Sequence, residues 1–102
     1  MNDTFEGQLG GLRRKFCDRA MAQSLDLERI VSELEDGVAA SRWEAEIRRI
    51  AHGIAGAGGT FGFAELSAHA NELGEIARRV PGPVELADAC RALVFEIKRG
   101  AA

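Results

Sequence analysis

The sequence predicts an all-α fold, an up-and-down four-helix bundle with an additional N-terminal helix. Apolar residues recur at three- and four-residue spacing through nearly all of the 102-residue chain, which is the pattern of amphipathic helices. No stretch alternates apolar and polar residues with the β-branched enrichment typical of strands. The segments between the apolar runs are short, about 2–5 residues, so consecutive helices are expected to pack antiparallel. We expect a single domain over residues 1–102, because a chain of this length suffices for one core.

The first third of the chain contains two apolar runs. The first predicts an amphipathic helix over roughly residues 5–22. Its apolar positions are Phe5, Leu9, Leu12, Phe16 and Ala20. The second run has Ser24 as a candidate N-cap and Gly37 near its end. Its apolar positions are Leu27, Ile30, Val31, Leu34 and Val38. The sequence leaves open whether the two runs form one bent helix or two separate helices.

A third helix is predicted to begin at Ser41. The residues Ser41-Arg42-Trp43-Glu44 match the capping box, in which the serine caps the helix and the glutamate reaches back to the serine backbone. The apolar positions of this helix are Trp43, Ile47, Ile50, Ile54, Ala57 and Phe61.

Two further helices complete the bundle. The fourth is predicted from about Phe63 to Val80, where Pro81-Gly82-Pro83 ends it, because proline cannot continue a helix but fits the first turn of the next. Its apolar positions are Phe63, Leu66, Ala70, Leu73, Ala77 and Val80. The fifth helix is predicted to end near Gly100, with its buried face made of Leu86, Cys90, Leu93 and Ile97.

Composition excludes several classes of protein. A content of 46% hydrophobic and 28% charged residues argues against disorder, and no uncharged stretch reaches the ~20 apolar residues of a membrane helix. The N-terminus carries no secretory signal pattern, so a cytoplasmic location is expected. A net charge of -3 argues against nucleic acid as a partner. Cys17 and Cys90 lack metal-ligand spacing and are expected to be small buried hydrophobes, so no metal or cofactor is expected.

His52 is predicted to point into solvent. With about 100° per residue around a helix, the apolar positions of its helix fall about 140° to 220° away from it. On the histidine's own face, Gly56 and Gly59 lie within about 40°, and Arg48, Arg49 and Ala55 lie about 40° to 60° away. The histidine therefore stands beside two arginines, with little side-chain bulk one and two turns further along.

The glycines of this helix have an energetic cost. Each glycine in a helix interior is less favourable than alanine by roughly 0.5–1 kcal/mol. Close packing between helices, or a helix that ends at Gly58-Gly59, would account for Gly58. Neither explanation suits Gly56 and Gly59, which share the histidine's face. We therefore interpret that face as a docking surface.

The chemistry of such a site is that of a phosphoryl acceptor. Imidazole is partly neutral near physiological pH, so its free nitrogen can act as a nucleophile. Neighbouring arginines would attract and partly neutralise the phosphoryl dianion. Phosphoryl transfer depends mainly on positioning and charge neutralisation, so a surface histidine can serve a partner that brings the Mg²⁺.

At these residues the sequence resembles the histidine-containing phosphotransfer (HPt) domains of bacterial phosphorelays. The residues of the motif are His52, Gly56, Ala57, Gly59 and Gly62, and the likeness continues through Leu66, Ala70 and Leu73. The resemblance implies a phosphorelay intermediate that is not itself an enzyme. His52 would accept a phosphoryl group from a receiver-domain aspartate or a hybrid histidine kinase, and pass it to another receiver domain.

This chain departs from the family pattern at two positions. Many HPt domains have a lysine where this chain has Ala55, and a polar residue where it has Gly74. Arg48 and Arg49, with Arg78 from the following helix, are expected to replace that support of the phosphoryl group.

The alternative function is a helical-bundle adaptor that binds a signalling partner through the same bare face without carrying phosphate. His69 is interpreted as a boundary histidine satisfied by a neighbour, and the basic run 12–15 as a solvated face or a contact for an acidic receiver surface. Nothing demands a dimer, so a monomer is expected. The sequence does not identify the upstream kinase, the downstream regulator, the stimulus or the direction of phosphate flow.

Overall fold

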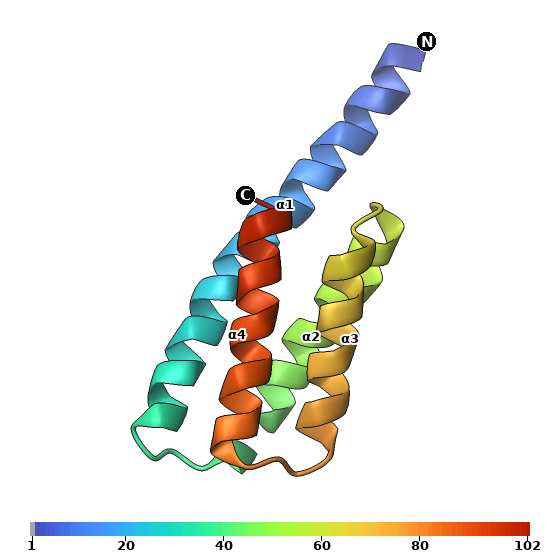
Figure 1. Ribbon diagram of the computed structural model, residues 1–102. Helices are drawn as coiled ribbons and strands as arrows, with labels where there is room; N and C mark the ends of the chain where they lie inside the picture. Colours follow the sequence, from blue (N-terminus) through green and yellow to red (C-terminus); the bar gives the residue numbers. More distant parts are fainter. Residues whose placement is uncertain (1) are drawn as a thin grey trace.

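The protein is a bundle of four α-helices in a computed structural model that describes residues 2–102, with side chains from residue 6 onward. The helices are α1 (Asn2–Glu35), α2 (Glu44–Thr60), α3 (Ala64–Arg78) and α4 (Pro83–Gly100), and a 3-10 turn η1 (Ala40–Arg42) precedes α2. Figure 1 shows consecutive helices running in opposite directions. α2 packs chiefly on α3, and α4 packs on α1 and α3. The predicted all-α architecture is confirmed, and the described residues contain no strand.

The core consists of the predicted apolar faces, brought together from all four helices. The largest fully buried apolar side chains are Leu27, Ile30, Ile47, Ile50, Ile54, Leu73, Leu86, Cys90, Leu93 and Ile97. Both cysteines are free, and burial raises the pKa of the Cys90 thiol to about 12, although the charge of Arg91 lowers it slightly. Cys90 is therefore a neutral core residue, as predicted, whereas Cys17 is only half-buried.

The two apolar runs of the first third form one continuous helix, α1. The additional N-terminal helix is therefore not a separate element, and of the two possibilities that the sequence leaves open the structure has the single helix. Ser24 does not cap a helix: it is fully buried inside α1, and its hydroxyl donates to the Met21 carbonyl at 2.6 Å. Because its own helix satisfies the hydroxyl, serine is tolerated at this interior position. The chain leaves α1 through Gly37, whose φ of 97° suits glycine.

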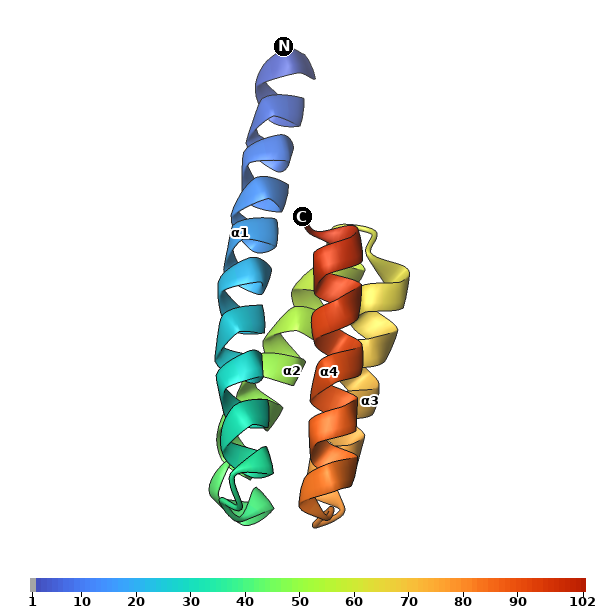
Figure 2. The same cartoon turned by 60° about the vertical axis from the view of Figure 1, so that its left-hand side comes forward.

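The N-terminal part of α1 runs past the end of the bundle (Figure 2). Leu9 and Leu12, predicted to lie on a buried face, are 45% and 51% exposed, and Leu12 only lines an open groove between α1 and α2. The buried face of α1 begins at Phe16. The side chain of Phe5, the first residue of that predicted face, lies outside the described residues.

Two predicted helix ends are also wrong. Ser41 lies in η1 rather than at a cap, and α2 begins at Glu44 with no side-chain cap at its N-terminus. The backbone N–H of Trp43 donates to the Ala40 carbonyl, so a turn of 3-10 helix replaces the capping box. The second difference concerns the C-terminus of α3, which was predicted at Val80. The helix stops at Arg78, and Val80, in the following turn, has a φ of 54° and is 82% exposed.

An aromatic cluster closes the end of the bundle where α2 turns into α3. The Phe16 ring of α1 lies 5.8 Å from the Phe61 ring and 5.5 Å from the Phe63 ring, between centroids. Between those two phenylalanines Gly62 adopts a φ of 84°, and the Phe63 N–H donates to the Gly58 carbonyl at 2.8 Å. This left-handed turn ends α2 and directs α3 back along it.

Candidate functional site

His52 lies on the solvent face of α2, about midway along the helix, as the helical geometry predicts. The same helix buries Ile47, Ile50 and Ile54 on its opposite face, so packing of the core turns the histidine outward. The His52 side chain lines a groove toward α3, and a second groove, toward α1, is lined by Gly53 and Ile54 of the same helix.

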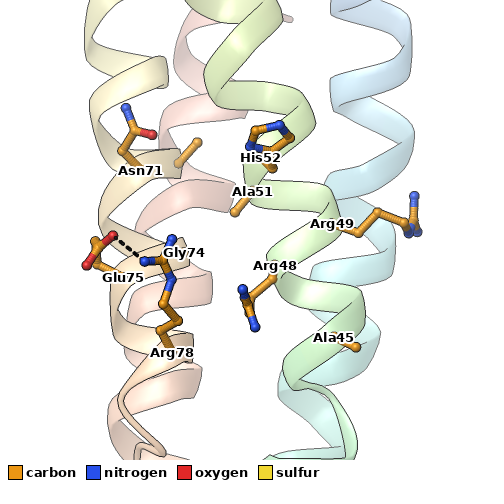
Figure 3. Close-up of a pocket in the computed structure, with 10 residues that line it drawn as sticks. Ala45, Arg48, Arg49, Ala51, His52, Asn71, Gly74, Glu75 and Arg78 are labelled. Carbon is orange, nitrogen blue, oxygen red and sulfur yellow. Dashed lines mark ion pairs between the residues drawn. The ribbon is translucent and has the colours of Figure 1, made fainter.

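The α2–α3 groove has a volume of about 460 Å³ and contains most of the predicted site residues. Its floor is made of small residues, among them Ala51, Ala70 and Gly74. His52 and Arg48 line the α2 wall, and the α3 wall is lined by Asn71, Glu75 and Arg78. Figure 3 shows Arg48 directed toward the groove and Arg49 turned away from it toward α1.

Two of the three arginines that line this groove, Arg48 and Arg78, are each paired with a carboxylate of their own helix, whereas Arg49 has no carboxylate partner among the described residues. Arg48 Nη1 lies 3.4 Å from Glu44 Oε1, and Arg78 Nη1 lies 3.6 Å from Glu75 Oε1. These side chains are all exposed by a third or more, so both pairs are weak, within about 0–1 kcal/mol. The guanidinium groups can therefore be recruited by a stronger anion.

Gly74 is one of the small residues that leave space in the α2–α3 groove. A Cβ added at Gly74 would meet the Ala51 Cβ at 3.8 Å, an ordinary contact, so close packing does not require glycine here. A larger side chain would extend into the space beside His52. Gly74 therefore keeps the groove open, at the usual cost of roughly 0.5–1 kcal/mol for glycine within a helix.

The α1–α2 groove, on the other side of His52, has a volume of about 430 Å³ and a different chemistry. Its apolar lining includes Phe16 of α1, Ile54 of α2 and Phe61, which follows the end of α2. Its basic lining residues are Lys15, Arg19 and Arg49. The basic run of α1 is thus more than a solvated face, since Arg13 also stacks on the Phe63 ring at 4.7 Å.

The glycines of α2 divide into two groups. Gly53 and Gly56 are exposed, and an added Cβ at either would meet nothing within 4 Å. Gly58 is buried, and its added Cβ would lie 3.6 Å from the backbone of Phe63 and from Ser67. Gly59 is exposed, but an added Cβ there would lie 3.7 Å from Ser67 Oγ. Gly56 thus leaves open space on the histidine's face, as predicted, whereas Gly58 and Gly59 lie against Ser67 of α3, so the prediction of a bare surface does not hold at Gly59.

Ser67 joins α3 to α2 at the level of the site. Its hydroxyl donates to the carbonyl oxygen of Ala55 at 2.7 Å, across the helix boundary. Ala55 itself is half-buried against the core and lines neither groove, so the structure does not bring it to the predicted arginines.

We predict that Ser67→Ala lowers the free energy of unfolding by about 1 kcal/mol relative to Ser32→Ala, the usual net worth of one hydrogen bond. Ser32 is exposed on α1, so its replacement changes helix propensity alone. Urea unfolding of both variants measures the difference. Equal stabilities of the two variants would show that the link between Ser67 and Ala55 is energetically unimportant.

Sequence reasoning did not assign Asn71, Gly74 and Glu75 to the site. These three residues and Arg78 are spaced three and four residues apart, which places all four on one face of α3. This spacing could have assigned them to the same site as Arg78. His69, on the same helix, has its Nδ1 2.9 Å from the Glu65 carbonyl oxygen, which confirms the expectation of a boundary histidine with a neighbouring partner.

Within the described residues, no group of three or more histidine, cysteine or acidic side chains has a metal-binding arrangement. None of the described helices is both long and apolar enough to span a membrane.

The comparison with protein families matches this chain to the Hpt domain over residues 11–100, which includes α2, α3, α4 and the packed part of α1. The comparisons with curated proteins and with solved structures gave no match. The matched region contains His52, both grooves and all of the buried core except Ala101, and it excludes the first turns of α1, which extend past the bundle. The chain therefore belongs to the Hpt domain family, whose members are phosphocarriers of two-component signalling that interact with receiver domains and kinases.

Proposed function

We propose that this protein is a phosphorelay intermediate in which His52 accepts a phosphoryl group and passes it on. The donor is a receiver-domain aspartate or a hybrid histidine kinase, and the acceptor is another receiver domain. The observation that carries the proposal is the exposed His52 ring beside open space at Gly56. A partner's active site would meet no side chain of the carrier at Gly56, one turn beyond the ring.

The reaction needs little from the carrier beyond a positioned nucleophile. An unprotonated imidazole nitrogen attacks the phosphorus of the aspartyl phosphate, the P–O bond to the aspartate breaks, and the carboxylate leaves. The reverse reaction delivers the phosphoryl group to the next receiver. The receiver supplies the Mg²⁺, and the carrier supplies positive charge around the developing phosphohistidine.

Arginines provide that charge in this chain. Many HPt domains have a lysine at the position where this chain has Ala55. Arg48 and Arg78 line the α2–α3 groove beside His52, and Arg49 lines both grooves, with its side chain turned toward α1. Positive charge on both sides of the ring suits an incoming dianion and an acidic partner surface.

We predict that Arg48→Ala and Arg49→Ala each slow phosphoryl transfer from a receiver about fivefold, the equivalent of ~1 kcal/mol for a partly exposed charge contact. Arg29→Ala is the control, because Arg29 is an exposed α1 residue that pairs with Asp26 and lines neither groove. Rapid-quench transfer assays give the rates. Normal rates in both groove variants would show that the arginines do not replace the missing lysine.

A non-phosphorylated adaptor remains the second candidate, because the α1–α2 groove alone offers apolar and basic contacts for a partner. Incubation of the wild-type protein with a phosphorylated receiver separates the two functions. The carrier takes up label that is acid-labile and base-stable, as a phosphoramidate bond requires. Stable binding of receivers without any transfer of label would favour the adaptor.

A further inference from the structure

The α2–α3 groove contains a carboxylate where a phosphoryl site would be expected to carry only positive and neutral groups. Glu75 lies on the groove wall, and its Oε1 is 3.6 Å from Arg78 Nη1 (Figure 3). The two side chains are 57% and 60% exposed, and both line the same groove as His52. In the unphosphorylated protein Arg78 therefore has an anionic partner within the site.

We propose that Glu75 is a positioning residue for Arg78, and that it makes the phosphorylated form of His52 less stable relative to the unphosphorylated form. The inference rests on the proposed function of His52. Once His52 is phosphorylated, the dianion and the Glu75 carboxylate compete for the same guanidinium. The dianion carries the larger charge, but it gains less from Arg78 than it would from an unpaired arginine.

The arrangement on the opposite wall supports this reading. Arg48, on α2, is likewise held by a carboxylate one turn away, that of Glu44, at 3.4 Å. Arg48 and Arg78 are thus both paired before the phosphoryl group arrives, whereas Arg49, which also lines the groove but is turned toward α1, has no carboxylate partner among the described residues. A carrier must release its phosphoryl group as readily as it accepts it, and internal competitors keep the phosphohistidine from becoming too stable.

The test uses a small donor, so that receiver docking does not enter. In phosphoramidate, an imidazole nitrogen of His52 attacks the phosphorus, the donor's P–N bond breaks and ammonia leaves. With excess phosphoramidate and ammonium at fixed concentrations, the ratio of phosphorylated to unphosphorylated protein reports the equilibrium constant. Phosphorus NMR of the intact full-length protein measures this ratio.

Glu75→Gln is expected to raise the ratio about three- to fivefold at low salt, and less at high salt, as for an exposed charge contact. Glu72→Gln is the matched control, because it makes the same change on an exposed face of α3 outside the groove, and it should leave the ratio unchanged. In an Arg78→Ala background the effect of Glu75→Gln should fall below half, since Glu75 acts through Arg78.

Two results would overturn the inference while leaving the proposed function intact. One is an equal ratio of phosphorylated to unphosphorylated protein in the wild type and in Glu75→Gln, with both phosphorylated on His52. The other is an undiminished Glu75→Gln effect in the Arg78→Ala background. Absence of any phosphorylation of the wild-type protein, by phosphoramidate and by receivers, would instead reject the proposed function itself.

Discussion

Replacement of His52 by glutamine is expected to abolish phosphoryl uptake from a phosphorylated receiver, with no measurable label on the protein. Glutamine approximates the size and polarity of the ring, but its amide nitrogen is not a nucleophile at neutral pH. Because His52 is exposed on α2, the fold and the thermal stability should be retained. Transfer of label from the receiver, followed with time on gels kept at alkaline pH, measures the effect.

His69→Gln is the matched control for this experiment. His69 is the only other histidine of the sequence, and it lies half-buried on α3, with its Nδ1 against the Glu65 carbonyl oxygen. This variant should take up label at the wild-type rate. Label on His52→Gln at wild-type levels, or its loss from His69→Gln, would mean that the carrier residue has been wrongly identified.

Gly56→Leu is expected to slow transfer from a receiver at least ~100-fold, a penalty typical of misplacing reacting groups by about 1 Å. The added side chain would occupy open space on the histidine's face, which a docked receiver has to approach. Uptake from phosphoramidate should stay within about twofold of wild type, because a small donor needs no docking surface. Stability should rise by roughly 0.5–1 kcal/mol, because leucine is the better helix former.

Gly10→Leu separates the steric effect from helix propensity. Gly10 is exposed within α1 in open space, before Phe16, where the buried face of the helix begins. This variant should gain helix propensity without any loss of transfer. A wild-type transfer rate for Gly56→Leu would show that the open space at Gly56 is not where the partner docks.

The periodicity of apolar residues was sufficient to predict the core and the orientation of His52. Ile47, Ile50 and Ile54 repeat at helical spacing, and their burial leaves the histidine no direction except outward. This inference is local, since it depends only on the geometry of one helix. The resemblance to HPt domains rests on the same short segment, and the family match extends it to residues 11–100.

Helix ends were predicted less well, because side chains that can cap also have other partners. Ser24 bonds to a carbonyl of its own helix, and Ser41 lies in a 3-10 turn. Leu12 and Val80 have apolar spacing, but Leu12 only lines an open groove and Val80 lies in the turn after α3. Spacing identifies the apolar face of a helix, but whether that face is covered depends on where the neighbouring helices end.

The grooves could not be predicted, because each needs two helices in a known register. Gly74 of α3 opens the α2–α3 groove only because it packs beside Ala51 of α2. Glu75 belongs to the site only because α3 turns it toward the same groove as His52. These relations arise from the turn at Gly62 and the contact of Gly58 with Ser67, which set how α3 lies along α2.

The most direct test of the central claim is to locate the phosphoryl group on the wild-type protein after transfer from a receiver. Proteolysis at neutral or alkaline pH, followed by mass spectrometry with electron-based fragmentation, assigns the modified residue. We predict a single phosphoryl group on His52, lost on brief acid treatment. A phosphoryl group on His69 or on a serine, or an unmodified His52 after a receiver has lost its phosphate to this protein, would contradict the assignment of His52 as the carrier.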